Sequence, residues 1–303
     1  MRGWAITSRG VFRTAAVLAA WLALPAFPAA AQPDPYELVE CSLRADDRNW
    51  ERLHDYEWVE WVRKVDFDKH GRPKKTDVKA FQVLQIEGTP YRRLISRFDK
   101  PLSPEEEESE RIKLKRAIAE RRAETPKQRA RRIREYEKRN RRIREPMKEI
   151  AEAFRFELEG EDEAGRRRVW VIRAWPRPGY RPRSSRAKLF TGLEGRLYID
   201  QQTCNWVRAE AELVKDLWFG LFLVRMYRGG AVLVENAPVD GDFWAPVRLR
   251  YRVKLRIGFF KLLHFEQEIR FRDYRRVGGA SGSRTPSGEG FAERRRDRLG
   301  PGG

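Results

Sequence analysis

The sequence predicts an α+β protein in which a large, curved antiparallel sheet of about ten strands has helices to one side. Segments of strand composition recur through most of the chain, and nearly all are joined by turns too short for a parallel crossover, which excludes a doubly wound α/β fold. In residues 248–257 apolar and basic residues alternate strictly, so this strand has one apolar face and one cationic face. With 41% hydrophobic and 12% aromatic residues among 303, the chain can form a core and is not wholly disordered.

The first 31 residues have the pattern of a secretory signal peptide. Three arginines and no acids surround the start, residues 15–27 are almost wholly apolar, and small residues follow up to Ala31. The apolar run is shorter than the roughly 20 residues that a spanning helix needs, which favours cleavage near Ala31 over a membrane anchor. We therefore expect export to the periplasm, a single domain at residues 32–277, and a disordered Gly/Ser/Arg tail at 278–303.

The mature chain is expected to open with a helix and three strands. Acids come early and apolar residues recur at helical spacing in residues 34–53, which predicts an amphipathic helix. Strand composition follows at residues 56–67, 78–86 and 91–98. Because short polar turns separate these segments, they should form consecutive antiparallel strands.

A charged helical insert is predicted at residues 104–150. Ser103-Pro104 and Thr125-Pro126 each supply an N-cap followed by a proline at the first helical position, which indicates two helices at 104–124 and 126–150. A helical hairpin is the simplest geometry. The insert is either a basic arm that contacts an anionic membrane or a partner, or a solvated pair of helices; its thin apolar stripe favours the second interpretation.

Strand composition returns after the insert and continues almost to the tail. The expected strands are residues 154–158, 169–175, 195–200, 206–214, 231–236, 244–257 and 265–274. Loops are expected at 159–167 and at the Pro/Arg-rich segment 176–186.

The chain is strongly basic, with 64 Lys and Arg against 45 Asp and Glu and a net charge of +19. Such a charge attracts anionic surfaces. In an exported protein these are membranes carrying anionic lipid, so we expect an anionic membrane surface as a possible partner and no nucleic acid. The sequence does not specify the oligomeric state.

No motif in the chain indicates catalysis. Nucleophile elbows, zinc-protease signatures and phosphate-binding loops are absent from the sequence, and three His with two Cys leave little material for a metal centre. We therefore expect no enzyme activity, no cofactor and no metal. Cys41 and Cys204 could form one disulfide after export, or they could be two separately buried thiols.

The order of elements resembles that of the LolA/LolB lipoprotein carriers and the RseB-type periplasmic sensors. The resemblance is carried by residues 55–60, by the strand 195–200 with the following Trp206-Val207 strand, and by 242–246 before the alternating strand. Uncharacterised exported proteins with a charged insert share the helix start at 100–107 and the loop at 176–182. The resemblance implies a LolA-like half-barrel and a binding or carrier role.

The resemblance also implies that the concave apolar face and its mouth bind lipid or the acyl chains of a lipoprotein. The expected ligand-binding residues are Leu213, Trp218, Phe219, Phe222, Tyr251, Val253, Leu255, Phe259 and Phe260. Alternatively, the apolar segments 217–224 and 257–263 form a loop that dips into a membrane surface, or they pack under the helices as core. Arg177, Arg181 and Arg183 are expected to contact an anionic headgroup, unless their loop is simply solvated. A second class of function is a sensor that contacts a protein partner through the charged arm.

Overall fold

The computed structural model describes residues 32–220, 223–259 and 261–277. All its helices and strands belong to the second of two compact units, which begins at Pro33. The predicted signal peptide and tail, and the candidate ligand residues Phe222 and Phe260, lie outside the described residues.

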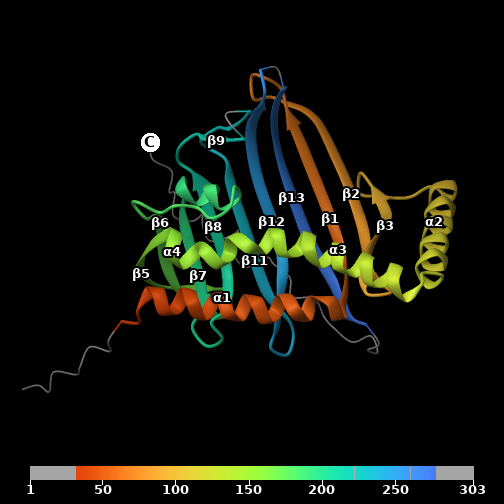
Figure 1. The fold of residues 1–303 in the computed structure, drawn as a ribbon, viewed down its shortest axis with the longest axis horizontal. Helices are drawn as coiled ribbons and strands as arrows, with labels where there is room; N and C mark the ends of the chain where they lie inside the picture. Colours follow the sequence, from red (N-terminus) through yellow and green to blue (C-terminus); the bar gives the residue numbers. More distant parts are fainter. Residues whose placement is uncertain (1–31, 221–222, 260, 278–303) are drawn as a thin grey trace, which may run out of the picture. The chain divides into compact units, whose positions relative to one another are not determined.

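The described part of the chain forms a sheet of thirteen antiparallel strands, which confirms the predicted fold class (Figure 1). The strands are β1 Tyr56–Phe67, β2 Pro73–Ile86, β3 Thr89–Arg97, β4 Lys100–Pro101, β5 Phe154–Ala164, β6 Arg167–Pro176, β7 Leu193–Asp200, β8 Trp206–Leu213, β9 Leu217–Phe219, β10 Val224–Met226, β11 Ala231–Asp240, β12 Phe243–Ile257 and β13 Lys261–Arg276. Their spatial order is β4-β3-β2-β1-β13-β12-β11-β8-β7-β6-β5, and β10 joins β9 to β12. The first and last long strands are therefore neighbours in the middle of the sheet.

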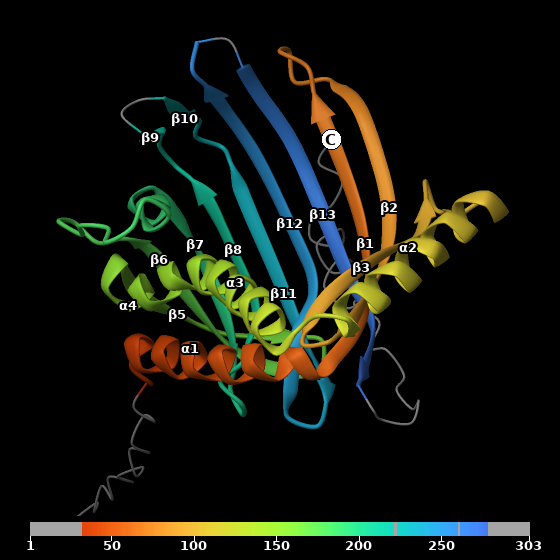
Figure 2. The ribbon, with the colours of Figure 1, turned by 45° about the vertical axis from the view of Figure 1, so that its right-hand side comes forward.

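Four α-helices accompany the sheet within the described residues. They are α1 Pro35–Arg52, α2 Pro104–Arg122, α3 Pro126–Arg144 and α4 Ile150–Ala153. Figures 1 and 2 show α1 and α3 crossing the same face of the sheet near one end of β11, β12 and β13. The predicted caps form: the side chains of Ser103 and Thr125 each accept a hydrogen bond from the backbone of the first helical turn. No helix among the described residues is long and apolar enough to span a membrane.

The charged insert differs from the sequence-based prediction in two ways. Figure 1 shows α2 and α3 meeting at an angle instead of running antiparallel, so the expected hairpin is not formed. Instead, α2 contacts strand β3, next to the edge of the sheet, where Glu107 pairs with Arg93. In addition, α3 ends at Arg144 and a 3-10 helix follows at Glu145–Glu149, because Pro146 lacks the N–H that a continuing α-helix needs.

The structure also differs from the prediction at residues 159–167, where two strands replace most of the predicted loop. β5 and β6 pair from Phe154↔Pro176 to Ala164↔Arg167 with one register shift between Leu158 and Gly160, which leaves only two residues for the turn. The polar residues of this segment favoured a loop in the sequence, but both faces of these strand ends can carry charged side chains where no helix covers them.

Register gives the sheet two distinct faces. Ile172, Leu197, Ala209, Val234 and Leu249 are direct cross-strand neighbours in one row. Ile172 packs in the core beside α1, so we call the side of this row the helix face. The next residue along each strand points the other way, to what we call the opposite face.

The main core lies between α1 and the β5–β7 end of the sheet. Val39 of α1 is 1% exposed and packs with Phe156, Ile172 and Ile199, the last two of which are fully buried. A second cluster, where β1, β12 and β13 begin or end, stacks Tyr56 on Phe243 with ring centroids 4.2 Å apart. Both clusters are at the end of the sheet that the helices cross.

A disulfide joins α1 to the turn between β7 and β8. Cys41 and Cys204 are bonded with their Cα atoms 5.8 Å apart, which decides between the two alternatives that the sequence left open. Nearby, the indole Nε1 of Trp206 donates a hydrogen bond to Asp46 of α1 at 3.0 Å. The opening helix is thus fixed to the sheet covalently and by a hydrogen bond.

The turn also explains why the strand at residues 195–200 ends in Asp200. The buried carboxylate of Asp200 accepts hydrogen bonds from the backbone N–H groups of Gln202 and Thr203 and an ion pair from Arg167. Gly195, at the start of the same motif, has no room for a side chain, because a Cβ there would lie 1.9 Å from the carbonyl oxygen of Glu210. These residues therefore serve the fold.

Candidate functional site

The helix face is only partly covered by helices. Figures 1 and 2 show β12 and β13 extending well beyond α1 and α3. We call the part of the helix face beyond these two helices the uncovered half. On β12 it carries Tyr251, Val253 and Leu255, which are all half-buried.

Together with their neighbours on the adjacent strands, Tyr251, Val253 and Leu255 form an apolar strip. Leu263 and Phe265 of β13 lie directly opposite Leu255 and Val253, and Val232 of β11 lies opposite Tyr251. All of them are half-buried as well. The contrast with the fully buried core near α1 follows from the positions of the helices, because a sheet face becomes dry only where another layer packs on it.

The strip has an ordered aromatic centre and a polar border. The rings of Tyr251 and Phe265 contact edge to face with centroids 6.0 Å apart, and burial raises the pKa of the Tyr251 hydroxyl. The ammonium of Lys64 on β1 lies 5.0 Å from the Phe265 ring and 2.8 Å from the carboxylate of Asp66. An apolar strip bordered by an ion pair suits a molecule that has an apolar chain and a polar end.

Not all of the sequence-predicted ligand residues lie on this strip. Tyr251, Val253 and Leu255 do, and Phe219 shares their face through its pairing with Val224 and Ile257. Leu213 also faces the helices but is only 2% exposed, so it contributes to the core.

Two predicted residues lie elsewhere. Trp218 is on the opposite face, where the guanidinium of Arg225 lies 5.0 Å from its ring. Phe259 is at the end of the β12–β13 hairpin and is 89% exposed.

The predicted anion-contact arginines are held by the protein itself. The Arg177 guanidinium donates to the carbonyl oxygens of Ala151 and Phe154, both at 3.3 Å. Arg183 pairs with Glu152 at 2.6 Å, whereas Arg181 is exposed. Arg177 and Arg183 therefore anchor the Pro/Arg-rich loop to α4 and β5.

A buried carboxylate completes this anchor. Glu149 is 3% exposed and accepts hydrogen bonds from the hydroxyl of Tyr180 at 2.5 Å and from the backbone N–H of Arg183 at 3.0 Å. Burial, together with the hydrogen bond to Glu149, raises the pKa of Tyr180 far above its ordinary value. Tyr180 thus stays a neutral hydrogen-bond donor at any physiological pH.

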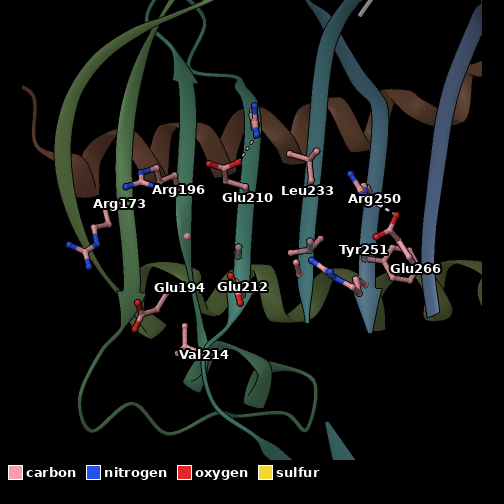
Figure 3. Close-up of a pocket in the computed structure, with 16 residues that line it drawn as sticks. Arg173, Glu194, Arg196, Glu210, Glu212, Val214, Leu233, Arg250, Tyr251 and Glu266 are labelled. Atoms are coloured by element: carbon pink, nitrogen blue, oxygen red, sulfur yellow. Dashed lines mark hydrogen bonds and ion pairs between the residues drawn. The ribbon is translucent and has the colours of Figure 1, made fainter. Parts of the chain in front are cut away.

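The opposite face has a charged groove of about 740 Å³, which Figure 3 shows with a helix behind the strands. It is lined by Arg173, Arg196, Glu210, Glu212, Arg250 and Glu266. Arg250 pairs with Glu266 at 2.9 Å, and Arg196 pairs with Glu159 of β5 at 2.6 Å. Arg248 and Arg250 of the expected cationic face are therefore neutralised by carboxylates on neighbouring strands, a cross-strand pairing that the sequence of one strand does not show.

One carboxylate on this face is buried. Glu268 is 8% exposed and accepts from Arg248 and Arg270, both at 2.9 Å. Burial alone would raise its pKa, but the two guanidinium groups outweigh burial and hold the pKa of Glu268 below its ordinary value. This arrangement is an ion-pair network with a structural role.

A second cavity of about 490 Å³ lies between α1 and α3. Trp50 of α1 and His54 of the 3-10 helix Leu53–Asp55 line one side, and Asn140 and Met147 line the other. At one end Arg144 joins the helices through Asp46 at 2.7 Å. Within the described part of the chain, no group of three His, Cys, Asp or Glu side chains is placed to hold a metal ion.

No protein-family model matches the chain, and no curated protein sequence matches it. Three solved structures are similar to it over most of its length. A DUF1329 family protein from Desulfovibrio piger is 11% identical, with 82% of this chain and 96% of that chain covered and a TM-score of 0.27. A putative outer membrane lipoprotein-sorting protein domain from Vibrio parahaemolyticus is 9% identical, with 80% and 95% covered and a TM-score of 0.29. A LolA superfamily protein from Nitrosomonas europaea is 9% identical, with 82% and 96% covered and a TM-score of 0.29.

The LolA superfamily that the sequence resembles is thus also found among the solved structures similar to this chain.

Proposed function

We propose that this chain is an exported binding protein that holds lipid, or the acyl chains of a lipoprotein, against the uncovered half of the helix face. The observation that carries the proposal is the strip of half-buried apolar side chains around Tyr251, Val253 and Leu255. Each methylene that a ligand buries there would contribute about 0.8 kcal/mol. A chain of ordinary acyl length could therefore be held without any polar contact.

The distribution of burial supports this proposal over a filled core. Near α1 the helix face is dry, with Ile172 and Ile199 fully buried. Further along the same face, β12 and β13 have no fully buried apolar residue beyond the helices. Side chains that are apolar, adjacent and incompletely covered are typical of a binding surface.

The predicted signal peptide and the disulfide support an exported location. A bridge between Cys41 and Cys204 persists in an oxidising compartment such as the periplasm and is rare in the cytosol.

The first experiment is native mass spectrometry with lipid extraction on the mature protein, purified from an exported source without detergent. Phospholipid or acylated peptide at near one per chain is expected. Uptake of a fluorescent fatty acid then tests the site: Val253→Asp should abolish uptake, because a carboxylate in the strip cannot be solvated beside a bound chain. Leu233→Asp is the matched control, since Leu233 is also half-buried but lies on the opposite face.

A clean apo mass together with no fatty-acid uptake by the wild type would overturn the proposal. Equal loss of uptake in both aspartate variants would also overturn it, because the effect would then come from general destabilisation.

A second candidate function is contact with a protein partner through α2 and α3. One observation favours it: neither helix has a fully buried residue, and Ile112 of α2 and Ile143 of α3 are 55% and 64% exposed. If the wild type carries no lipid, residues 104–150 are the segment for which protein partners should be sought.

A further inference from the structure

Exposed apolar side chains gather at one end of the sheet. Among the described residues, nine large apolar side chains are exposed, and four of them are at the ends of two adjacent hairpins. They are Leu223 at 63%, Ile257 at 41%, Phe259 at 89% and Leu262 at 38% exposed. We call these four residues the apolar tip.

Backbone hydrogen bonds hold the tip together. Val224 of β10 pairs with Ile257 of β12, and the N–H of Gly258 donates to the carbonyl oxygen of Leu223 at 2.7 Å. Gly258 has a φ of +58°, which lets the chain turn tightly there, and the next residue is the exposed Phe259. The tip is therefore a joint feature of two hairpins.

The tip is surrounded by positive charge. Residues 217–228 and 252–264 contain six Lys and Arg and no Asp or Glu. Arg225 pairs with Asp216, but within the described part of the chain no ion pair involves Arg256 or Lys261. Each of these two cations lies directly across the strand pair from a tip residue: Lys261 is opposite Ile257, and Arg256 is opposite Leu262.

A third hairpin adds to this charge. Figures 1 and 2 both show the turn between β1 and β2 at the same end of the strands as the tip. Lys69, Lys74 and Lys75 in and beside this turn are exposed.

We propose that the apolar tip inserts into the surface of an anionic phospholipid membrane while the cations around it contact the lipid headgroups. A projecting set of large apolar side chains has no pocket of its own to fill, and the cations around it outnumber the carboxylates, which favours contact with an anionic bilayer. The inference stands independently of acyl-chain binding. It does, however, place the uncovered half next to the membrane, because Ile257 continues the apolar row of Tyr251, Val253 and Leu255.

Vesicle sedimentation with the full mature chain tests the proposal. Binding is expected to vesicles of phosphatidylcholine mixed with phosphatidylglycerol, weakly or not at all to phosphatidylcholine alone, and less at high salt. Phe259→Ser should lower the partition coefficient by roughly tenfold or more. Lys261→Gln should lower it by about fivefold, since each cation near an anionic surface contributes about one kcal/mol.

Phe98→Ser is the matched control. Phe98 is 58% exposed but lies in the turn between β3 and β4, away from the tip, so its loss should leave partition unchanged. Equal binding to both kinds of vesicle, or equal losses in the Phe98 and Phe259 variants, would overturn the proposal. So would a concentration-dependent dimer that Phe259→Ser abolishes in the absence of vesicle binding, because the tip would then cover a second copy of the chain. Fatty-acid uptake in solution without vesicles reports on the proposed function alone, so the two proposals can fail separately.

Discussion

Replacing both Cys41 and Cys204 by alanine should lower the free energy of unfolding by about 2–5 kcal/mol. The disulfide spans 163 residues, and the chain-entropy relation for a loop of that length gives about 5 kcal/mol as its upper value. Urea unfolding of the oxidised wild type and of the double variant, analysed by linear extrapolation, gives the difference directly.

Cys204 provides an internal control for this experiment. Its φ is +59°, a left-handed conformation whose energetic cost is similar for cysteine and alanine. Alanine therefore removes the bridge without changing the backbone strain, whereas Cys204→Gly should recover about 1 kcal/mol of the loss. Stability of the double variant within about 0.5 kcal/mol of the wild type would refute the reasoning. A reductant that destabilised the double variant as much as the wild type would refute it as well.

Three further predictions concern the fold. Glu268→Gln should lower the free energy of unfolding by about 1–3 kcal/mol near neutral pH; because the pKa of Glu268 is lowered in the folded state, its contribution is lost as pH falls through that pKa, so unfolding curves of variant and wild type should converge in acid. Gly195→Ala should unfold the protein or lower its thermal midpoint strongly, since the new Cβ would overlap the carbonyl oxygen of Glu210; an unchanged midpoint would contradict the close approach. Ser103→Ala should speed hydrogen exchange in the first turn of α2, with a loss of about 1 kcal/mol that Ser109→Ala, in the middle of the same helix, should not reproduce.

The sequence was most informative where one local pattern determines the structure. Strict alternation in residues 248–257 predicted both the strand and its two faces, because side-chain direction in a strand has a period of two. Ser103 and Thr125 likewise predicted helix starts at the correct residues, since a cap acts within one turn. Pro146 also indicates where α3 ends, but the helix predicted at 126–150 extends beyond it.

Features that depend on register or on packing could not be predicted. The disulfide requires α1 to lie over the turn between β7 and β8, and no pattern in the sequence gives that distance. The charged groove was expected to be cationic because Arg250 was considered without its neighbour Glu266 on β13. The candidate site was predicted in its central residues, Tyr251, Val253 and Leu255, whereas which part of their face remains uncovered depends on where the helices cross.

The position of β13 has a consequence for how the protein folds. β13 ends at Arg276 and lies between β1 and β12, so it is the strand that joins the two halves of the sheet. Until β13 has been synthesised, β1 has an unpaired edge and its partner is some two hundred residues away along the chain. Completion of the sheet must therefore wait until the chain has been made as far as Arg276, and its many non-local pairings make the fold a slow one. A chain interrupted before β13 would leave two incomplete sheets with open edges, which are prone to proteolysis and aggregation.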